Sequence, residues 1–138
     1  MSEPIIKATD ETIHQIVKDE IARLGVNADL NHIDVSKVTN MEGLFKHSLF
    51  NGDISRWNVG NVKSMGAMFY KSIFNGDISN WNTSNVIDMS SMFECSQFNG
   101  DLSRWNVSNV LYIVDTFLDS SFTGDISKWD ISKVLLCK

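Results

Sequence analysis

The chain has 138 residues, the length of one ordinary domain, and 43% of them are hydrophobic, which is enough for a globular core. Lys and Arg number 12 against 17 Asp and Glu, so the net charge is −5 and the surface offers no general attraction for nucleic-acid phosphates. The sequence contains no apolar run that could span a bilayer, and its first residues lack the pattern of a secretory signal. We therefore expect a cytoplasmic protein that neither inserts into membranes nor binds nucleic acid.

Residues 1–25 form a segment that does not repeat. Its apolar residues recur at helical spacing and define one face of a helix, made of Ile13, Ile16, Val17, Ile21 and Leu24. Thr9 or Asp10 is the expected N-cap, and Gly25 the expected residue at which the helix ends. We predict that this helix covers the first unit of the repeat that follows.

A 24-residue unit recurs over the rest of the chain. FNGDISRWNVGNV begins at Phe50 and returns as FNGDISNWNTSNV at Phe74, as FNGDLSRWNVSNV at Phe98 and as FTGDISKWDISKV at Phe122. A weaker copy, VNADLNHIDVSKV, begins at Val26. The spacing predicts a solenoid over residues 26–138, with four full units (26–49, 50–73, 74–97 and 98–121) and a truncated fifth (122–138).

Within the unit that begins at Phe50, Trp57 and Val59 alternate as in a very short strand. Met65, Met68 and Phe69 then follow the spacing of one helical face, which predicts a helix of about two turns. Gly52 and its equivalents are expected to supply backbone freedom for the turn between units. Because no unit could bury its apolar side chains alone, successive coils must stack and share one core.

The recurring FNGDIS-x-W-N-V-S-N-V-x-x-M-x-x-M-F pattern closely resembles the BspA-like leucine-rich-repeat family of bacterial proteins, over roughly residues 29–134. The resemblance implies an α/β repeat solenoid of the leucine-rich-repeat kind, a right-handed coil of short parallel strands and short helices. It also implies protein binding, often at the cell surface. The family pattern carries over no catalytic residue.

Equivalent positions of successive units form columns. The Asp column could bridge a cation, or each Asp could accept backbone N–H bonds within its own turn, and we favour the second interpretation. Two Asn columns and one Trp column are expected to hold the coils together rather than to bind a ligand. The columns are Asp29, Asp53, Asp77, Asp101 and Asp125; Asn51, Asn75 and Asn99; Asn61, Asn85 and Asn109; and Trp57, Trp81, Trp105 and Trp129.

Catalytic signals are weak. His14, His32 and His47 have no companion nucleophile or acid pair at a spacing that catalysis uses. Cys95 and Cys137 lie far apart and match no metal-binding or redox pattern. We expect a protein that is not an enzyme, with no cofactor, no metal and reduced thiols.

Two candidate binding surfaces remain. At the C-terminal end the column that follows the Val of S-N-V turns from polar to apolar, and an exposed apolar patch usually marks an interface, although these residues could instead fold over the last coil as core. This surface consists of Ile87, Leu111, Tyr112, Val114, Val134, Leu135 and Leu136. A second possible surface flanks the buried Trp and Val positions and consists of Arg56, Asn58, Asn80, Asn82, Arg104, Asn106 and Lys128.

The expected function is a non-enzymatic protein–protein interaction module that forms a homodimer through its C-terminal end. Three alternatives stay open: a small soluble inhibitor or effector that docks on a target enzyme, a surface adhesin exported without a classical signal, and, least favoured, a metal-dependent hydrolase that uses the Asp column.

Overall fold

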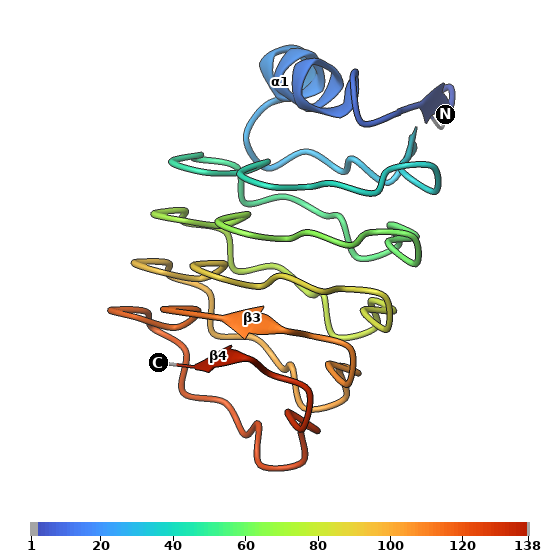
Figure 1. Cartoon of the computed structure of the whole chain (residues 1–138). Helices are drawn as coiled ribbons and strands as arrows, with labels where there is room; N and C mark the ends of the chain where they lie inside the picture. The colour runs from blue at the N-terminus through green and yellow to red at the C-terminus, as the bar shows by residue number, and fades with distance from the viewer. Residues whose placement is uncertain (1–2, 138) are drawn as a thin grey trace.

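The computed structural model describes residues 3–137, and of Leu136 and Cys137 it describes the backbone only. Helix α1 (Ile13–Leu24) lies at one end, and the coils stack below it in chain order (Figure 1). The remaining regular elements are two-residue strands. They are β1 (Ile6–Lys7), β2 (Ile33–Asp34), β3 (Tyr112–Ile113) and β4 (Leu136–Cys137).

The coils are joined in a 24-residue register. Single parallel bridges link Asn40 to Ser64, Ser64 to Asp88 and Asp88 to Tyr112, and β3 pairs with β4 through Tyr112 and Leu136. Equivalent positions of successive units therefore lie directly beside one another. This confirms the predicted stacking of repeats. The predicted strand at Trp57 and Val59 is wrong, because these residues carry no strand pairing and the bridges fall elsewhere in the unit.

The Trp column fills one side of the interior. Trp57, Trp81 and Trp105 are each 4% exposed, and their ring centroids lie 6.4 and 6.3 Å apart in nearly parallel planes. Each indole N–H donates to a backbone carbonyl of the preceding coil, as from Trp81 to Ile54 at 3.0 Å. The column thus buries large apolar area while its one polar atom is satisfied, which is the condition for burying a Trp.

Two Phe columns fill the other side. Within one column, neighbouring rings lie 5.6 Å apart at each of three successive steps. Within the other, the steps are 6.1, 6.3 and 6.4 Å. These columns consist of Phe45, Phe69, Phe93 and Phe117, and of Phe50, Phe74, Phe98 and Phe122. Neighbouring coils therefore share one aromatic core, as the repeat predicted.

The segments predicted as two-turn helices are rows of β-turns instead. In the second coil, the Met68 N–H donates to the Met65 carbonyl at 3.2 Å and the Ser72 N–H to the Phe69 carbonyl at 3.1 Å, so each bond spans three residues rather than four. Ala67 and Lys71 have φ of 52°, in the left-handed region that interrupts any right-handed helix.

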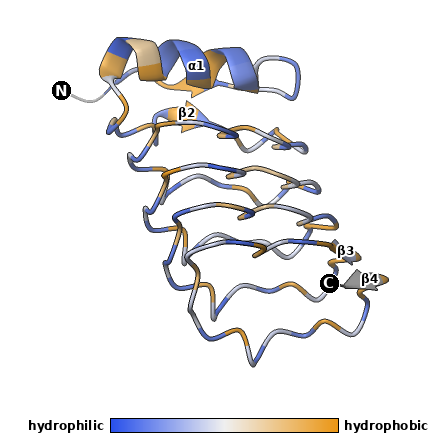
Figure 2. Cartoon of the chain, turned by 90° about the vertical axis from the view of Figure 1, so that its left-hand side faces the viewer, coloured by the Kyte–Doolittle hydropathy of each residue, from blue (hydrophilic) through white to orange (hydrophobic). Residues whose placement is uncertain are grey.

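The helix prediction is wrong because the intervening amides pair with the next coil. Phe69 N–H donates to the Met92 carbonyl at 2.9 Å, and Lys71 N–H donates to the Glu94 carbonyl at 3.0 Å. A turn row still directs Met65 and Phe69 into the core, so it produces the same apolar spacing as a helix. We call the surface built by residues 43–48, 67–72, 91–96 and 115–120 the turn wall; it lies on the left in Figure 1 and faces the viewer in Figure 2.

Gly52 is needed for a reason other than the one predicted. Its φ lies outside the left-handed region, but a Cβ at this position would stand 1.9 Å from the carbonyl oxygen of Ala28 in the preceding coil. That carbonyl accepts the N–H of Asp53 at 2.9 Å. Glycine therefore permits the close approach of two coils, not an unusual backbone angle.

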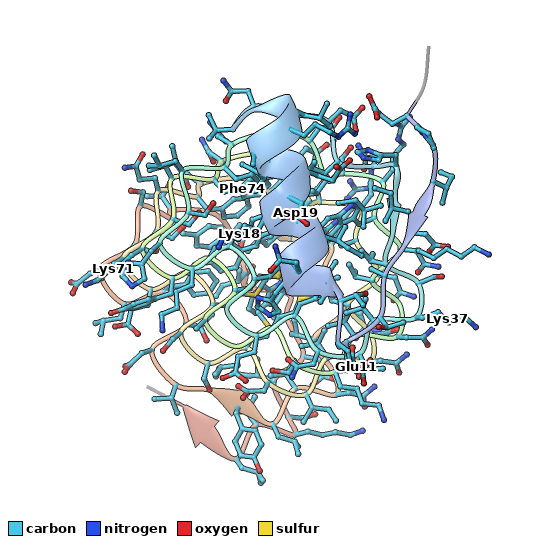
Figure 3. The ribbon with its side chains drawn as sticks, turned by 90° about the horizontal axis from the view of Figure 1, so that it is seen from above. Glu11, Lys18, Asp19, Lys37, Lys71 and Phe74 are labelled. Carbon is cyan, nitrogen blue, oxygen red and sulfur yellow. The ribbon has the colours of Figure 1, made fainter. Side chains whose placement is uncertain are left out.

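Helix α1 covers the first coil, as predicted. Seen from above, it crosses the ring of coils (Figure 3). Ile13 and Val17 are buried, and the rest of the predicted apolar face packs against the core at its edge. β1 adds to this cover by pairing with β2 in parallel.

The ends of α1 match the prediction only in part. Gly25, with φ of 99°, ends the helix as expected, but the N-cap is Thr12 rather than Thr9 or Asp10. Asp10 instead accepts the N–H groups of Thr39 at 2.7 Å and Asn40 at 3.2 Å. Its carboxylate thereby ties the N-terminal segment to the first coil.

Candidate functional site

The Asp column is occupied by local turn bonds. Asp53 Oδ1 accepts the Ser55 N–H at 2.9 Å and the Ser55 hydroxyl at 2.7 Å, and Asp77 repeats this arrangement with Ser79. These bonds, first from the Ser side chain and then from its backbone, hold the pKa of Asp53 and Asp77 below its ordinary value. The interpretation of the column as a set of turn-forming carboxylates is confirmed.

The Asn columns join coils through side-chain bonds to the backbone. Asn51 Oδ1 accepts the N–H of Asn75 at 2.8 Å, and Asn75 Oδ1 accepts that of Asn99 at 2.8 Å. In the second column, Asn85 Nδ2 donates to the carbonyl of Gly60 at 2.7 Å. These amides serve the stack, as expected.

Both Asn columns change at the fifth coil. Thr123 takes the next position of the first column, and its N–H donates to Asn99 Oδ1 at 2.8 Å. Lys133 takes the next position of the second, and its Nζ donates to Asn109 Oδ1 at 2.9 Å. Thr123 therefore lacks the amide oxygen with which Asn51, Asn75 and Asn99 each accept an N–H of the following coil, and Lys133 lacks the amide N–H with which Asn85 and its equivalents bond back to the preceding coil.

The seven residues of the possible binding face flanking Trp and Val are all exposed on one side of the stack. Its Asn side chains mostly serve their own turns: Asn58 Oδ1 accepts the Gly60 N–H at 3.0 Å. Arg104 Nη2 donates to Asn80 Oδ1 at 3.1 Å, and Arg56 Nη2 lies 3.8 Å from the Asp29 carboxylate. This face is hydrophilic and uniform along the stack.

The residues predicted to form the C-terminal surface lie mostly on the side of the solenoid, next to β3 and β4. Leu111 N–H donates to the Ile87 carbonyl and Leu135 N–H to the Leu111 carbonyl, both at 2.8 Å, so these three residues form one column. We call Ile87, Leu111 and Leu135 the side stripe. A groove of about 310 Å³ lies along it and is also lined by Lys63 and Lys133.

The other members of that prediction are distributed around the stripe. Tyr112 is 37% exposed, whereas Val114 and Val134 are half-buried. The side chain of Leu136 lies outside the described residues. The prediction therefore groups residues of two neighbouring surfaces.

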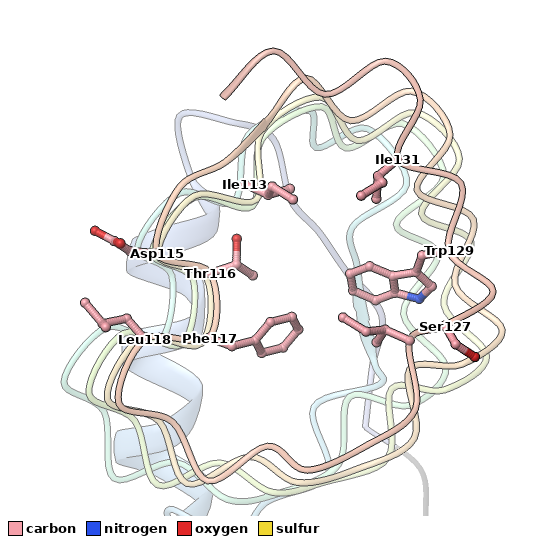
Figure 4. A pocket seen from close by; sticks show the side chains of 9 residues that line it. Ile113, Asp115, Thr116, Phe117, Leu118, Ser127, Trp129 and Ile131 are labelled. Carbon is pink, nitrogen blue, oxygen red and sulfur yellow. The ribbon is translucent and has the colours of Figure 1, made fainter. Parts of the chain in front are cut away.

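The end of the stack holds a cavity that the sequence prediction missed. Coil five, which begins at residue 122, covers coil four (residues 98–121) only in part. A cavity of about 550 Å³ opens between Phe117 and Trp129 (Figure 4). We call it the end cavity. Its lining is mostly apolar and consists of Ile113, Asp115, Thr116, Phe117, Leu118, Ile126, Ser127, Trp129 and Ile131.

Most of these residues, among them Phe117, Trp129 and Ile131, belong to columns that are buried in the coils above; Asp115, Leu118 and Ser127 do not. Phe69 and Phe93 are fully buried, while Phe117 is only partly buried and Ile131 is 47% exposed. The backbone changes in the same way: Phe93 N–H donates to the Thr116 carbonyl at 2.9 Å, but Phe117 N–H has no acceptor among the described residues. The one sign of this cavity in the sequence is that Phe117, Trp129 and Ile131 are the last members of their core columns.

The chain matches one family model, described as Mycoplasma protein of unknown function, DUF285, over residues 16–119 and again over residues 74–138. The chain belongs to the DUF285 family. The two DUF285 matches overlap, as a tandem repeat allows, because one model aligns to the same units in two registers. No curated protein and no solved structure matches this DUF285 chain. Within its described residues, no helix combines the length and the apolar character needed to cross a membrane.

One buried charged cluster in this DUF285 protein was also missed. Glu20 Oε1 lies 2.6 Å from His32 Nε2 and 2.7 Å from Arg23 Nη2, and Arg23 Nη2 also contacts Glu3 at 2.6 Å. Arg23 first, and His32 second, hold the pKa of Glu20 at about 2. Glu3, Glu20 and His32 form the only group of three potential metal ligands found among the described residues. The Arg23 guanidinium bridges the two carboxylates, and the contact between Glu20 and His32 fastens α1 to the first coil.

Proposed function

We propose that this protein is a non-enzymatic protein-binding module that self-associates through its C-terminal end, at the end cavity and the adjoining side stripe. The observation that carries this proposal is the change in burial along the core columns. Phe117 and Trp129 keep the positions of core aromatics but are only partly buried and line an open cavity, whereas their equivalents in the preceding coils are buried. Covering them removes apolar surface from water, which favours association.

A second copy is a suitable cover because this end is self-complementary. A two-fold contact places the same surface of both chains face to face, so that surface must carry both a hollow and a projection. The end cavity is the hollow. Ile131, which is 47% exposed at its rim, is the projection. In this arrangement Ile131 of each copy enters the cavity of the other.

The repeat architecture supports the same proposal. Solenoids use their extended surfaces and ends to bind other proteins, and the FNGDIS-x-W pattern resembles the BspA-like leucine-rich-repeat proteins, for which protein binding is implied. We extend that likeness to the coil type, a right-handed solenoid of the leucine-rich-repeat kind in which rows of turns take the place of helices.

Sedimentation velocity over a range of protein concentrations tests the self-association. The unmodified chain is expected to dimerise, and Ile131→Asp is expected to raise the dissociation constant about a hundredfold, since it removes apolar contact and buries an unpaired carboxylate. Ile5→Asp is the matched control, because Ile5 is 65% exposed in the N-terminal segment, away from this end. Leu111→Asp tests the side stripe separately.

The melting temperature of each variant shows whether it is folded. A chain that stays monomeric at every concentration, or a dimer that Ile131→Asp and Leu111→Asp leave unchanged, overturns self-association through this end.

A further inference from the structure

The charges of the turn wall are segregated along the solenoid axis. In the first two coils its Lys and His residues are Lys46, His47 and Lys71, and residues 43–48 and 67–72 include no Asp or Glu. In the third and fourth coils its charged groups are acidic, and consist of Glu94, Asp115 and Asp119. The whole chain carries a net charge of −5, so the basic half of this wall stands out against an acidic surface.

The basic half is organised around Tyr70. The Nζ atoms of Lys46 and Lys71 lie 5.7 and 5.4 Å from the centroid of the Tyr70 ring, and the His47 ring meets it edge-on at 5.4 Å. These contacts gather the positive charge at one place on the wall. Lys71 forms no ion pair with Glu94 of the adjacent coil, so its charge stays available.

The acidic half is exposed to a smaller extent than the basic half. Asp119 is exposed and Glu94 is half-buried. Asp115 and Leu118 point away from the core (Figure 4). Neither Asp119 nor Glu94 forms an ion pair with another of the residues that the structure describes.

An antiparallel two-fold arrangement matches these halves level by level. With the axis between the second and third coils, coil one of one copy faces coil four of the other, and coil two faces coil three. Lys46 then lies opposite Leu118, and His47 lies opposite Asp119. Tyr70 lies opposite Glu94, and Lys71 lies opposite Cys95. Glu42, just before the wall in coil one, meets the uncharged Val114. A parallel arrangement would instead place each basic group against its own copy.

We propose that the turn wall is a second self-association surface, which pairs side by side with the turn wall of another copy in antiparallel orientation through these opposite charges. Two exposed leucines fit this pairing as well. Leu49, 65% exposed, lies just after the wall in coil one, and Leu118, 46% exposed, lies in the wall of coil four, so pairing brings them to the same level. The turn wall adjoins the end cavity at residues 115–118, but the charged groups Lys46, Lys71, Glu94 and Asp119 do not line that cavity.

Reversal of charges in the full chain tests this pairing by sedimentation velocity at low and at high sodium chloride. Lys71→Glu brings a carboxylate to the level of Glu94 of the other copy, one position away from it, twice in the dimer, and is expected to raise the dissociation constant about tenfold at low salt. The double variant Lys71→Glu with Glu94→Lys restores opposite charges across the two-fold axis and is expected to restore association. Lys37→Glu, an identical charge change on the opposite side of the stack (Figure 3), is the control and is expected to change nothing.

Salt separates this contact from the one at the end cavity. Pairing of the turn walls weakens as sodium chloride rises, because exposed charges are screened, whereas apolar association at the end strengthens in sulfate. The proposal is overturned by a chain that is monomeric at low salt. It is also overturned if Lys71→Glu does not weaken association. A double variant that has an unchanged melting temperature but does not regain association overturns it as well.

Discussion

Ala67→Gly is expected to stabilise the protein, against the usual effect of introducing glycine. Ala67 has φ of 52°, and a left-handed conformation costs an L-residue about 1–2 kcal/mol. Glycine removes this strain but gives the unfolded chain more conformational freedom, which costs about 0.4–1 kcal/mol. The Ala67 N–H still donates to the Ser90 carbonyl in the next coil. The net gain is therefore about 0.5–1 kcal/mol.

The sign of this effect distinguishes a row of turns from a helix. In a helix, Gly in place of Ala would destabilise the protein by about 1 kcal/mol. Two neighbouring variants complete the comparison. Gly43→Ala, at the equivalent position of coil one with φ of 65°, is expected to destabilise. Gly66→Ala is expected to stabilise by about 0.4–1 kcal/mol, because Gly66 has no left-handed φ and a Cβ there would have no neighbour closer than 3.6 Å.

Urea and thermal unfolding followed by Trp fluorescence measure these differences, and a gain of about 1 kcal/mol corresponds to about 3 °C in melting temperature for a chain of this size. If Ala67→Gly lowers the melting temperature while Gly43→Ala leaves it unchanged, the left-handed turn rows are wrong.

Two further variants test other contacts of the stack. Asn75→Ala is expected to lower the free energy of unfolding by about 1 kcal/mol because the Asn99 N–H loses its acceptor; Asn75→Asp keeps an acceptor oxygen and should cost clearly less in urea unfolding, whereas equal losses would contradict this role. The pKa of Glu20 falls from 4.5 to about 2 on folding, so its ionised form adds stability above pH 4.5 that is lost as the pH falls towards 2. Glu20→Gln should therefore be less stable at pH 7 and show a flatter decline over that window, and an unchanged acid profile would contradict the cluster.

The sequence predicted the stack correctly because its columns repeat at an exact period. Trp57, Trp81 and Trp105 recur every 24 residues, and shared burial is the only way in which units this short can cover such side chains. The local conformation was predicted less well. Met65, Met68 and Phe69 face the core in a helix and in a turn row alike, so apolar spacing alone could not distinguish the two.

The candidate site was predicted only in part for a related reason. The apolar drift at Ile87 and Leu111 was visible as a departure from the repeat, and these residues do line a groove. Phe117 and Trp129 follow the repeat rule, so their residue type carries no sign of exposure. What exposes them is the incomplete cover that coil five provides, which depends on stacking in three dimensions.

Hydrogen exchange of the four indole N–H groups tests the shared core most directly, because each has its own NMR resonance and its own carbonyl partner one coil away. Trp57, Trp81 and Trp105, each 4% exposed, are expected to exchange slowly, whereas the half-buried Trp129 should exchange faster at concentrations where the chain is monomeric. Indole exchange at Trp81 as rapid as in an unfolded peptide would contradict the in-register stacking of the coils.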